Sequence, residues 1–226
     1  EPDACASDQR VEETLAVFQQ ILWTAPPDLI SVRVNADSQH NRVVRLIASL
    51  VQMIQQQQQD TASPSTRVVV TSDWVDAAIQ AKAHGIHVKE SHRTKIPAIR
   101  QAFQQAGSTS ALPPALIGTS AHSVESALNA LVQHHPDYFF VGTCYVTQTH
   151  PEKGSDDVEG PSLPGMVRHA MEEHSRHQQQ QDSKKELPVV LAIGGIDATN
   201  CHEPVALGAH GVATIRAILQ AKDPIG

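Results

Sequence analysis

Short apolar runs alternate with amphipathic helical patterns along almost the whole chain, and this alternation limits the fold more than any other feature of the sequence. The runs are rich in Val and Ile, which suits strands that are buried on both faces of a parallel sheet. Seven strands are predicted, over residues 29–34, 67–71, 85–88, 116–119, 138–141, 189–193 and 211–213.

Helices are expected before the first strand and after each strand, because apolar residues recur there with the period of an α-helix. Thr119 or Ser120 is expected to open the fifth long helix. The predicted helices cover residues 9–23, 42–56, 72–84, 94–106, 120–134, 164–181 and 215–221, with a shorter helical pattern after residue 195.

The alternation of strands and helices predicts parallel strands joined by right-handed crossovers. The predicted fold class is therefore α/β, a (β/α)8 TIM barrel, in one domain over residues 1–226 in which residues 1–8 are disordered or a linker. A closed barrel has eight strands, and the chain starts at a helix, so the first strand is missing from this chain. Either that strand lies upstream of Glu1, or the sheet is open and doubly wound.

Composition argues against some classes of binding partner and indicates a cellular compartment. The formal net charge of −7 argues against a nucleic-acid partner, and no apolar run approaches the roughly 20 residues that a membrane span needs. Cys5, Cys144 and Cys201 have no metal-type spacing, which indicates reduced thiols in an intracellular compartment, cytoplasmic or organellar. A homo-oligomer is compatible with the chain, although the sequence does not give the oligomeric state.

Two glycines, Gly194 and Gly195, follow the apolar strand 189–193 and predict a tight turn. A second strand-to-helix turn, at Thr214, Ile215 and Arg216, comes soon afterwards. Neighbouring turns of this kind bring free main-chain N–H groups and helix N-termini together, which suits a phosphate group. In (β/α)8 barrels a phosphate site is often found after the last two strands. We therefore expect these residues to bind a phosphorylated ligand.

The ends of the other strands carry mainly hydroxyl, imidazole and cationic groups, with few carboxylates, which indicates anion binding. Each has a structural alternative: Asp73 is an N-cap or a Mg²⁺ ligand, Arg33 reaches solvent or clamps a phosphate, and His92 and His122 are surface residues or functional ones. Cys144 is interpreted as a buried apolar residue. The remaining candidates are Ser72, Ser120, Thr147, Thr149 and His150.

Several blocks of sequence resemble the thiamine phosphate synthase and thiazole tautomerase family over about residues 28–224. RVVVTSDWVDAAIQAKAHGIHV is similar to the family's strand–Asn–Asp–helix–GVHL block, and LIGTSAHSVESALNAL to its IGxSxHSxEEA block. DYFFVGTCYVTQTH is similar to DYVGxGPxxPTxTK. The closing VVLAIGGI and GAHGVATIRAILQAKDP are similar to VAIGGI and GADGVAVxSAIxxAxDP.

The resemblance implies a (β/α)8 barrel that joins hydroxymethylpyrimidine pyrophosphate to thiazole phosphate, with Mg²⁺ assisting the loss of pyrophosphate. It implies small phosphorylated heterocycles as ligands. By position, Asp73 matches the first Mg²⁺ ligand, Arg33 the strand-end arginine and Ser120 the serine of the SxH block. The threonines of PTxTK match Thr147 and Thr149, and the thiazole phosphate site matches Gly194, Gly195 and 212–215.

The chain departs from the family pattern at several charged positions. His92 replaces the second metal-ligand aspartate, His150 replaces the lysine of PTxTK, and Ser72 replaces the asparagine before Asp73. Ser31 and Asn35 replace the glutamine and lysine of QxRxK, and Arg216 stands where a serine is expected. Three functions follow as hypotheses: a synthase, a tautomerase that uses His122 for acid–base chemistry, and a non-catalytic barrel that binds a phosphate ligand or a protein partner.

Overall fold

The computed structural model describes residues 3–60, 66–107, 114–147, 154, 156–178 and 186–219. These residues divide into two compact units, which are described separately. Among the described residues, the first unit contains residues 3–60, 66–89, 95–107, 114–117 and Leu219, and the second contains Glu90–Thr94 and residues 118–147, 154, 156–178 and 186–218. Among the described helices, none is both long and apolar enough to cross a lipid bilayer.

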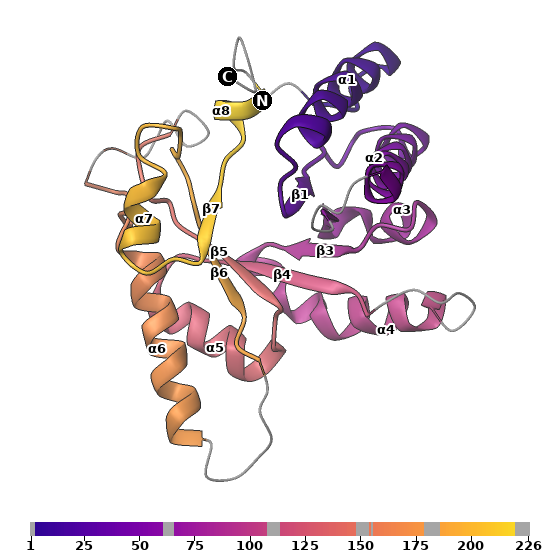
Figure 1. Ribbon diagram of the computed structural model, residues 1–226. Helices are drawn as coiled ribbons and strands as arrows, with labels where there is room; N and C mark the ends of the chain where they lie inside the picture. Colours follow the sequence, from indigo (N-terminus) through magenta and orange to yellow (C-terminus); the bar gives the residue numbers. More distant parts are fainter. Residues whose placement is uncertain are drawn as a thin grey trace. The chain divides into compact units, whose positions relative to one another are not determined.

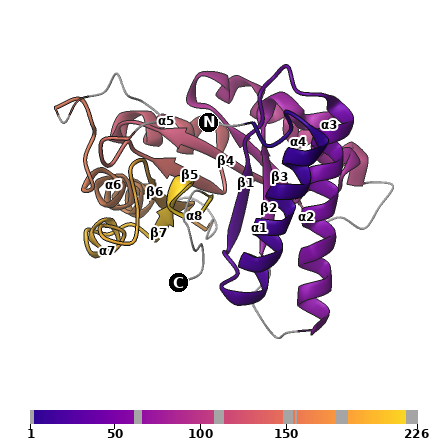
Figure 2. The same ribbon diagram turned by 90° about the horizontal axis from the view of Figure 1, so that it is seen from above.

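The first unit alternates helices with three parallel strands and the start of a fourth (Figure 1). Strand β1 pairs with β2, and β2 pairs with β3, with Ile30 opposite Val68 and Val70 opposite Ile86. Helices α1 and α2 lie side by side (Figure 2). The elements are α1 (Asp8–Thr24), β1 (Leu29–Val32), α2 (His40–Asp60), β2 (Arg67–Thr71), η1 (Ser72–Trp74), α3 (Val75–Gln80), β3 (Gly85–Val88) and α4 (Ile96–Gly107).

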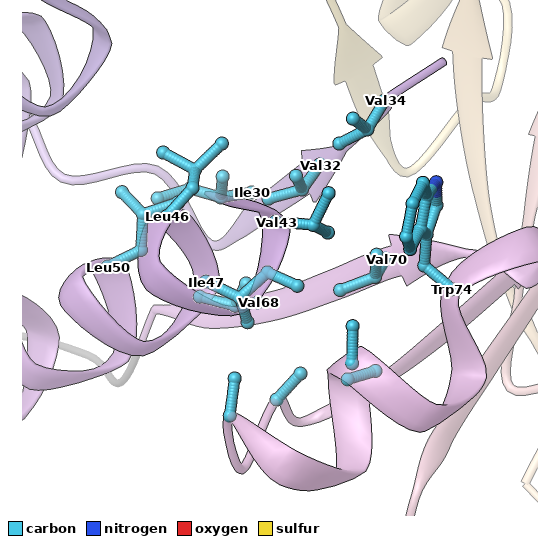
Figure 3. Close-up of a cluster of buried hydrophobic side chains, with 14 of the residues drawn as sticks. Ile30, Val32, Val34, Val43, Leu46, Ile47, Leu50, Val68, Val70 and Trp74 are labelled. Atoms are coloured by element: carbon cyan, nitrogen blue, oxygen red, sulfur yellow. The ribbon is translucent and has the colours of Figure 1, made fainter. Parts of the chain in front are cut away.

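The core of the first unit lies between its strands and α2, as Figure 3 shows. Val68 and Val70 from β2 are fully buried, and so are Ile47 and Leu50 from α2. Since burying a side chain of this size stabilises the fold by about 1.5–3 kcal/mol, this core fixes the strands whose ends carry Arg33, Ser72 and Asp73. Trp74 from η1 is also part of this core.

The second unit continues the same pattern with parallel strands in the order β4–β5–β6–β7. Helices α5 and α6 pack against each other, and Phe139, Val167 and Val190 are fully buried in the core beneath them. The elements are η2 (Glu90–Lys95), β4 (Leu116–Ala121), α5 (Val124–His134), β5 (Tyr138–Val141), α6 (Leu163–Gln178), β6 (Val189–Ile193), α7 (His202–Ala206), β7 (Gly211–Ala213) and α8 (Arg216–Leu219).

The order of the strands confirms an α/β fold of the TIM-barrel class. Each strand pairs with the strand that follows it in the chain, whereas a doubly wound sheet reverses direction at a switch point. The alternative of a doubly wound sheet is therefore wrong. Within the described residues there are seven strands, and none of them precedes α1.

Several predicted boundaries were wrong: the helix predicted over residues 72–84 ends at Gln80, and the one predicted over 42–56 runs to Asp60. The error that bears on the candidate site lies at the end of β4. Thr119 and Ser120 do not open a helix, because β4 continues to Ala121 and pairs with β5 through Ser120 opposite Phe140. The helix begins three residues later, where the side chain of Ser123 accepts a hydrogen bond from the N–H of Ser126 at 3.1 Å. As a result Ser120 lies near the end of a strand, β4.

Candidate active site

The strand ends of the first unit bring together one carboxylate and several basic groups. Lys89 Nζ lies 3.8 Å from the Asp73 carboxylate, and both side chains are partly exposed. Burial, together with the nearby charge of Arg33, lowers the pKa of His87 to about 4. Asp73 therefore follows β2 as predicted, but its negative charge already faces an ammonium group.

Three buried polar atoms at the end of β2 have no hydrogen-bond partner in the described part of the chain: Thr71 Oγ1, Ser72 Oγ and Trp74 Nε1. Buried hydroxyl and indole groups are normally paired, so such a group of unpaired atoms needs a partner from water or a ligand. Ser72 is the residue that the sequence predicts to bind substrate. Its hydroxyl is oriented inward and has no protein acceptor among these residues.

The residues predicted as metal ligands do not form a Mg²⁺ site by themselves. Mg²⁺ prefers several oxygen ligands in octahedral geometry, whereas Asp73 supplies one carboxylate and His92 offers ring nitrogens. The His92 Nδ1 atom is buried without a hydrogen-bond partner. In the described ranges, no group of three or more His, Cys, Asp or Glu side chains could hold a metal ion.

In the second unit, the buried side chain of Arg93 supports the end of β4 through hydrogen bonds. Its guanidinium donates to Thr119 Oγ1 at 3.3 Å, to the carbonyl oxygen of Ser120, and to Ser126 O and Oγ at 2.9 and 2.8 Å. The Glu90 carboxylate lies 3.9 Å away and opposes the effect of burial, which lowers the pKa of Arg93. These contacts hold Ser120 and the start of α5 in one arrangement.

His122 directly follows β4, and about half of its side chain is exposed. Its Nδ1 hydrogen-bonds to the carbonyl oxygen of Gly142, and its Nε2 lies 3.9 Å from Glu90 Oε2. On the other side, Glu159 Oε1 lies 3.7 Å from Nδ1, while Glu159 Oε2 accepts a hydrogen bond from the N–H of Thr143. The imidazole is thus placed between two carboxylates and is about half exposed.

Gly194 and Gly195 form the predicted turn, with φ angles of 100° and 65° that favour glycine. The segment after β5 packs directly against them, since the N–H of Tyr145 donates to Gly194 O at 3.0 Å. A Cβ atom on Gly195 would lie 2.6 Å from the carbonyl oxygen of Val146. The turn therefore requires glycine for two reasons, its backbone angles and this close approach.

The turns after β6 and β7 lie next to each other. The hydroxyl of Thr214 donates to the carbonyl oxygen of Ile196 at 2.9 Å, which joins the two turns at one edge of the unit. This adjacency is the geometry on which the predicted phosphate site depends. Ile215 follows Thr214 in the second turn, and Arg216 is the first residue of the short helix α8.

The remaining predicted residues divide between the described and undescribed parts of the chain. Thr147 is described and half-buried, whereas Thr149 and His150 lie outside the described residues. Cys144 is buried, which raises the pKa of its thiol to about 11 and confirms its interpretation as an apolar residue. Sequence reasoning did not single out Arg93 and Glu159, because their partners lie 16 to 33 positions away in the chain.

Comparison with known proteins gives the family. The sequence model described as "Thiamine monophosphate synthase" matches residues 5–218. The chain belongs to this family. The match covers both units, including the strand ends that carry the candidate site.

Individual relatives have the same name. The thiamine-phosphate synthase of Geobacillus thermodenitrificans is 32% identical over 155 residues, which cover 69% of this chain and 58% of that protein. The thiamine-phosphate synthase of Mycobacterium sp. strain JLS is 28% identical over 220 residues, 97% of this chain and 85% of that protein. The alignment with the Geobacillus protein therefore spans less than two thirds of that protein's length.

The fold also matches a solved structure. The thiamine phosphate pyrophosphorylase from Pyrococcus furiosus superimposes with a TM-score of 0.66, at 22% sequence identity, over 96% of this chain and 87% of that one. At this level of identity the match supports the TIM-barrel fold alone.

Proposed function

We propose that this protein is a thiamine-phosphate synthase-like transferase that joins hydroxymethylpyrimidine pyrophosphate to thiazole phosphate. The observation that carries the proposal is the family match over residues 5–218 together with the paired turns after β6 and β7. Small phosphorylated heterocycles are its proposed ligands. The free thiols of Cys5, Cys144 and Cys201 support an intracellular location.

The thiazole phosphate is assigned to the turns of the second unit. Gly194 and Gly195 form the tight turn after β6, and the phosphate is assigned to the main-chain N–H groups at this turn. Thr214 and Ile215 border the same edge, and Arg216 adds a guanidinium that can pair with two phosphate oxygens. Replacing Arg216 by Ala should therefore raise KM for thiazole phosphate more than it lowers kcat.

The pyrophosphate is assigned to cationic and hydroxyl groups at the other strand ends. Arg33 and Lys89 would stabilise the charge that develops on the leaving group, and Ser72 has an unpaired hydroxyl that can donate to it. Within the second unit, Thr147, Thr149 and His150 are proposed to contact substrate, and Ser120 is proposed to take part in catalysis.

A synthase assay tests the proposal. Purified protein is incubated with both substrates, with and without Mg²⁺, and thiamine phosphate is measured. Asp73→Ala should lower kcat/KM by about 10- to 100-fold, the effect of losing one charged contact, whereas the neighbouring exposed Asp76 gives a matched control in Asp76→Ala. Absence of product at high protein concentration with Mg²⁺ present would reject synthase activity.

A second function, isomerisation of a thiazole carboxylate phosphate, is favoured by the setting of His122 between Glu90 and Glu159. An imidazole that is held but half-exposed can take a proton from one ring position and return it to another. The thiazole carboxylate phosphate should then isomerise without added metal, and His122→Ala should abolish the reaction. Binding of thiazole phosphate without either turnover would indicate a non-catalytic barrel.

A further inference from the structure

The hydrogen bond to Gly142 fixes the tautomer of His122. A carbonyl oxygen can only accept a hydrogen bond, so the Nδ1 atom of His122 must carry the hydrogen. In the neutral ring, Nε2 then has the free lone pair and is the basic nitrogen. The imidazole therefore presents a defined base, and what faces Nε2 decides how well the ring holds a proton.

Glu90 faces Nε2 with its second carboxylate oxygen. Glu90 Oε2 is buried, has no hydrogen-bond partner in the described part of the chain, and lies 3.9 Å from Nε2. That distance is beyond hydrogen-bonding range, so Glu90 acts on the ring through its charge. A carboxylate beside a lone pair gains nothing, whereas a carboxylate near a protonated ring is attracted to its positive charge.

The other oxygen of Glu90 is held in place. Glu90 Oε1 accepts a hydrogen bond from the hydroxyl of Ser126 and lies 3.9 Å from Arg93 Nη1. Arg93 is fixed by Thr119, Ser120 and Ser126. The carboxylate is thus anchored at one oxygen while the other points to the imidazole. The charged groups around this pair are Arg93 on the side of Glu90 and Glu159 on the Nδ1 side of His122.

We propose that Glu90 is the positioning residue of a proton-transfer pair, in which His122 Nε2 exchanges a proton with the bound heterocycle. Nε2 takes a proton from one ring position, the electrons of that bond stay in the heterocycle, and the same proton is returned to another position. Glu90 remains ionised throughout and stabilises the imidazolium, so the exchange needs no co-reactant. The inference rests on the proposed function for its substrate class.

The pairing itself is tested without substrate. The ring nitrogens of His122 are observed by ¹⁵N NMR at pH 7 in the full chain, in the wild type, in Glu90→Gln and in the exposed control Glu125→Gln. We expect the wild-type and Glu125→Gln signals to lie closer to those of an imidazolium than the Glu90→Gln signals. Identical His122 signals in all three proteins would overturn the pairing.

The role of Glu90 in turnover is tested with the thiazole carboxylate phosphate as substrate. Glu90→Gln should lower kcat by about 10- to 100-fold with little change in KM, a loss typical of weakened acid–base catalysis, and Glu90→Asp should recover part of it. The pH–rate profile should change in Glu90→Gln and not in Glu125→Gln.

The two tests separate this inference from the proposed function. If the wild type turns over no heterocycle, the proposed function fails, while the NMR comparison still decides whether Glu90 is paired with His122. If Glu90→Gln does not fold, Ser126→Ala, which releases Glu90 Oε1, should weaken the imidazolium-like signals of His122. Unchanged signals in folded Ser126→Ala would reject the anchoring role.

Discussion

The Nδ1 atom of His84 accepts a hydrogen bond from the main-chain N–H of Val68 at 2.9 Å, and the N–H of His84 donates to the carbonyl oxygen of Val68 at 2.8 Å. His210 makes the same pair of bonds with Val190, at 3.0 and 2.9 Å. Each histidine lies in an Ala-His-Gly turn and joins the start of one strand to the next. Because a main-chain N–H only donates, both Nδ1 atoms must be unprotonated.

These two histidines should make the fold sensitive to acid. Burial lowers the pKa of both rings, with Arg67 adding to the effect at His84 and Arg168 at His210. The unfolded chain therefore binds more protons, so this contribution to stability is complete above about pH 6.5 and is lost as the pH falls below it. Urea denaturation between pH 8 and pH 5 should show the decrease.

Replacing these rings by a carboxylate should remove part of that sensitivity. In His210→Asp the side chain can still accept from Val190 N–H and stays ionised down to about pH 4. We expect a smaller loss of stability between pH 7 and pH 5 in this variant, whereas the exposed control His177→Ala should behave as the wild type. An unchanged pH dependence in both His84→Asp and His210→Asp would contradict the assignment.

Gly195→Ala should destabilise the protein by about 1–3 kcal/mol, the cost of holding a side chain at an unfavourable positive φ. The variant also places a methyl group against the carbonyl oxygens of Tyr145 and Val146. Gly107→Ala is the matched control, because a Cβ atom at Gly107 meets nothing within 4 Å. Thermal and urea unfolding of the two variants give the comparison, and equal stabilities would argue against the close approach.

Arg93→Met should cost about 2–4 kcal/mol, because it removes several charge-assisted hydrogen bonds and leaves acceptors unpaired. The exposed Arg176, which pairs with Glu172 at 3.6 Å, is a suitable control, and Arg176→Met should cost less than about 1 kcal/mol. The free energies of unfolding test both. A double variant, Arg93→Met with Glu90→Gln, should lose less than the sum of its two parts.

Leu46→Ala should cost about 2–5 kcal/mol, since Leu46 is buried between α2 and the strands of the first unit. Val132→Ala on α5 removes an exposed side chain and should change stability by less than about 0.5 kcal/mol. A small effect at Leu46 would mean that the core relaxes around the lost volume.

Strand positions could be predicted closely from the sequence, because each strand is a run of β-branched residues between turn residues. All seven strands were placed to within two residues at each end; β1 was predicted two residues too long, and β4 two residues too short. There Ser120 was interpreted as a helix cap from its residue type, but pairing with β5 keeps it extended and Ser123 becomes the cap. A serine offers the same side chain to either role, and only the neighbouring strand decides between them.

The candidate site could be predicted in part. Gly194 and Gly195 were found because a positive φ leaves a signature in residue type. Arg93 and Glu159 leave none, since a charged residue in a loop is usually solvated. Their roles depend on which carbonyl or hydroxyl group the fold brings beside them, as with Arg93 and Ser126, which are 33 positions apart.

Thr143 is joined to the far end of the segment between β5 and α6 by three hydrogen bonds: its carbonyl oxygen accepts from the N–H groups of Glu159 and Gly160, at 3.0 and 3.2 Å, and its own N–H donates to the Glu159 carboxylate. The backbone at Glu159 and Gly160 thus returns to Thr143, just after the end of β5. The stretch between Thr143 and Glu159 could therefore be replaced by one of different length or composition without displacing β5 or α6, provided that these three hydrogen bonds are retained.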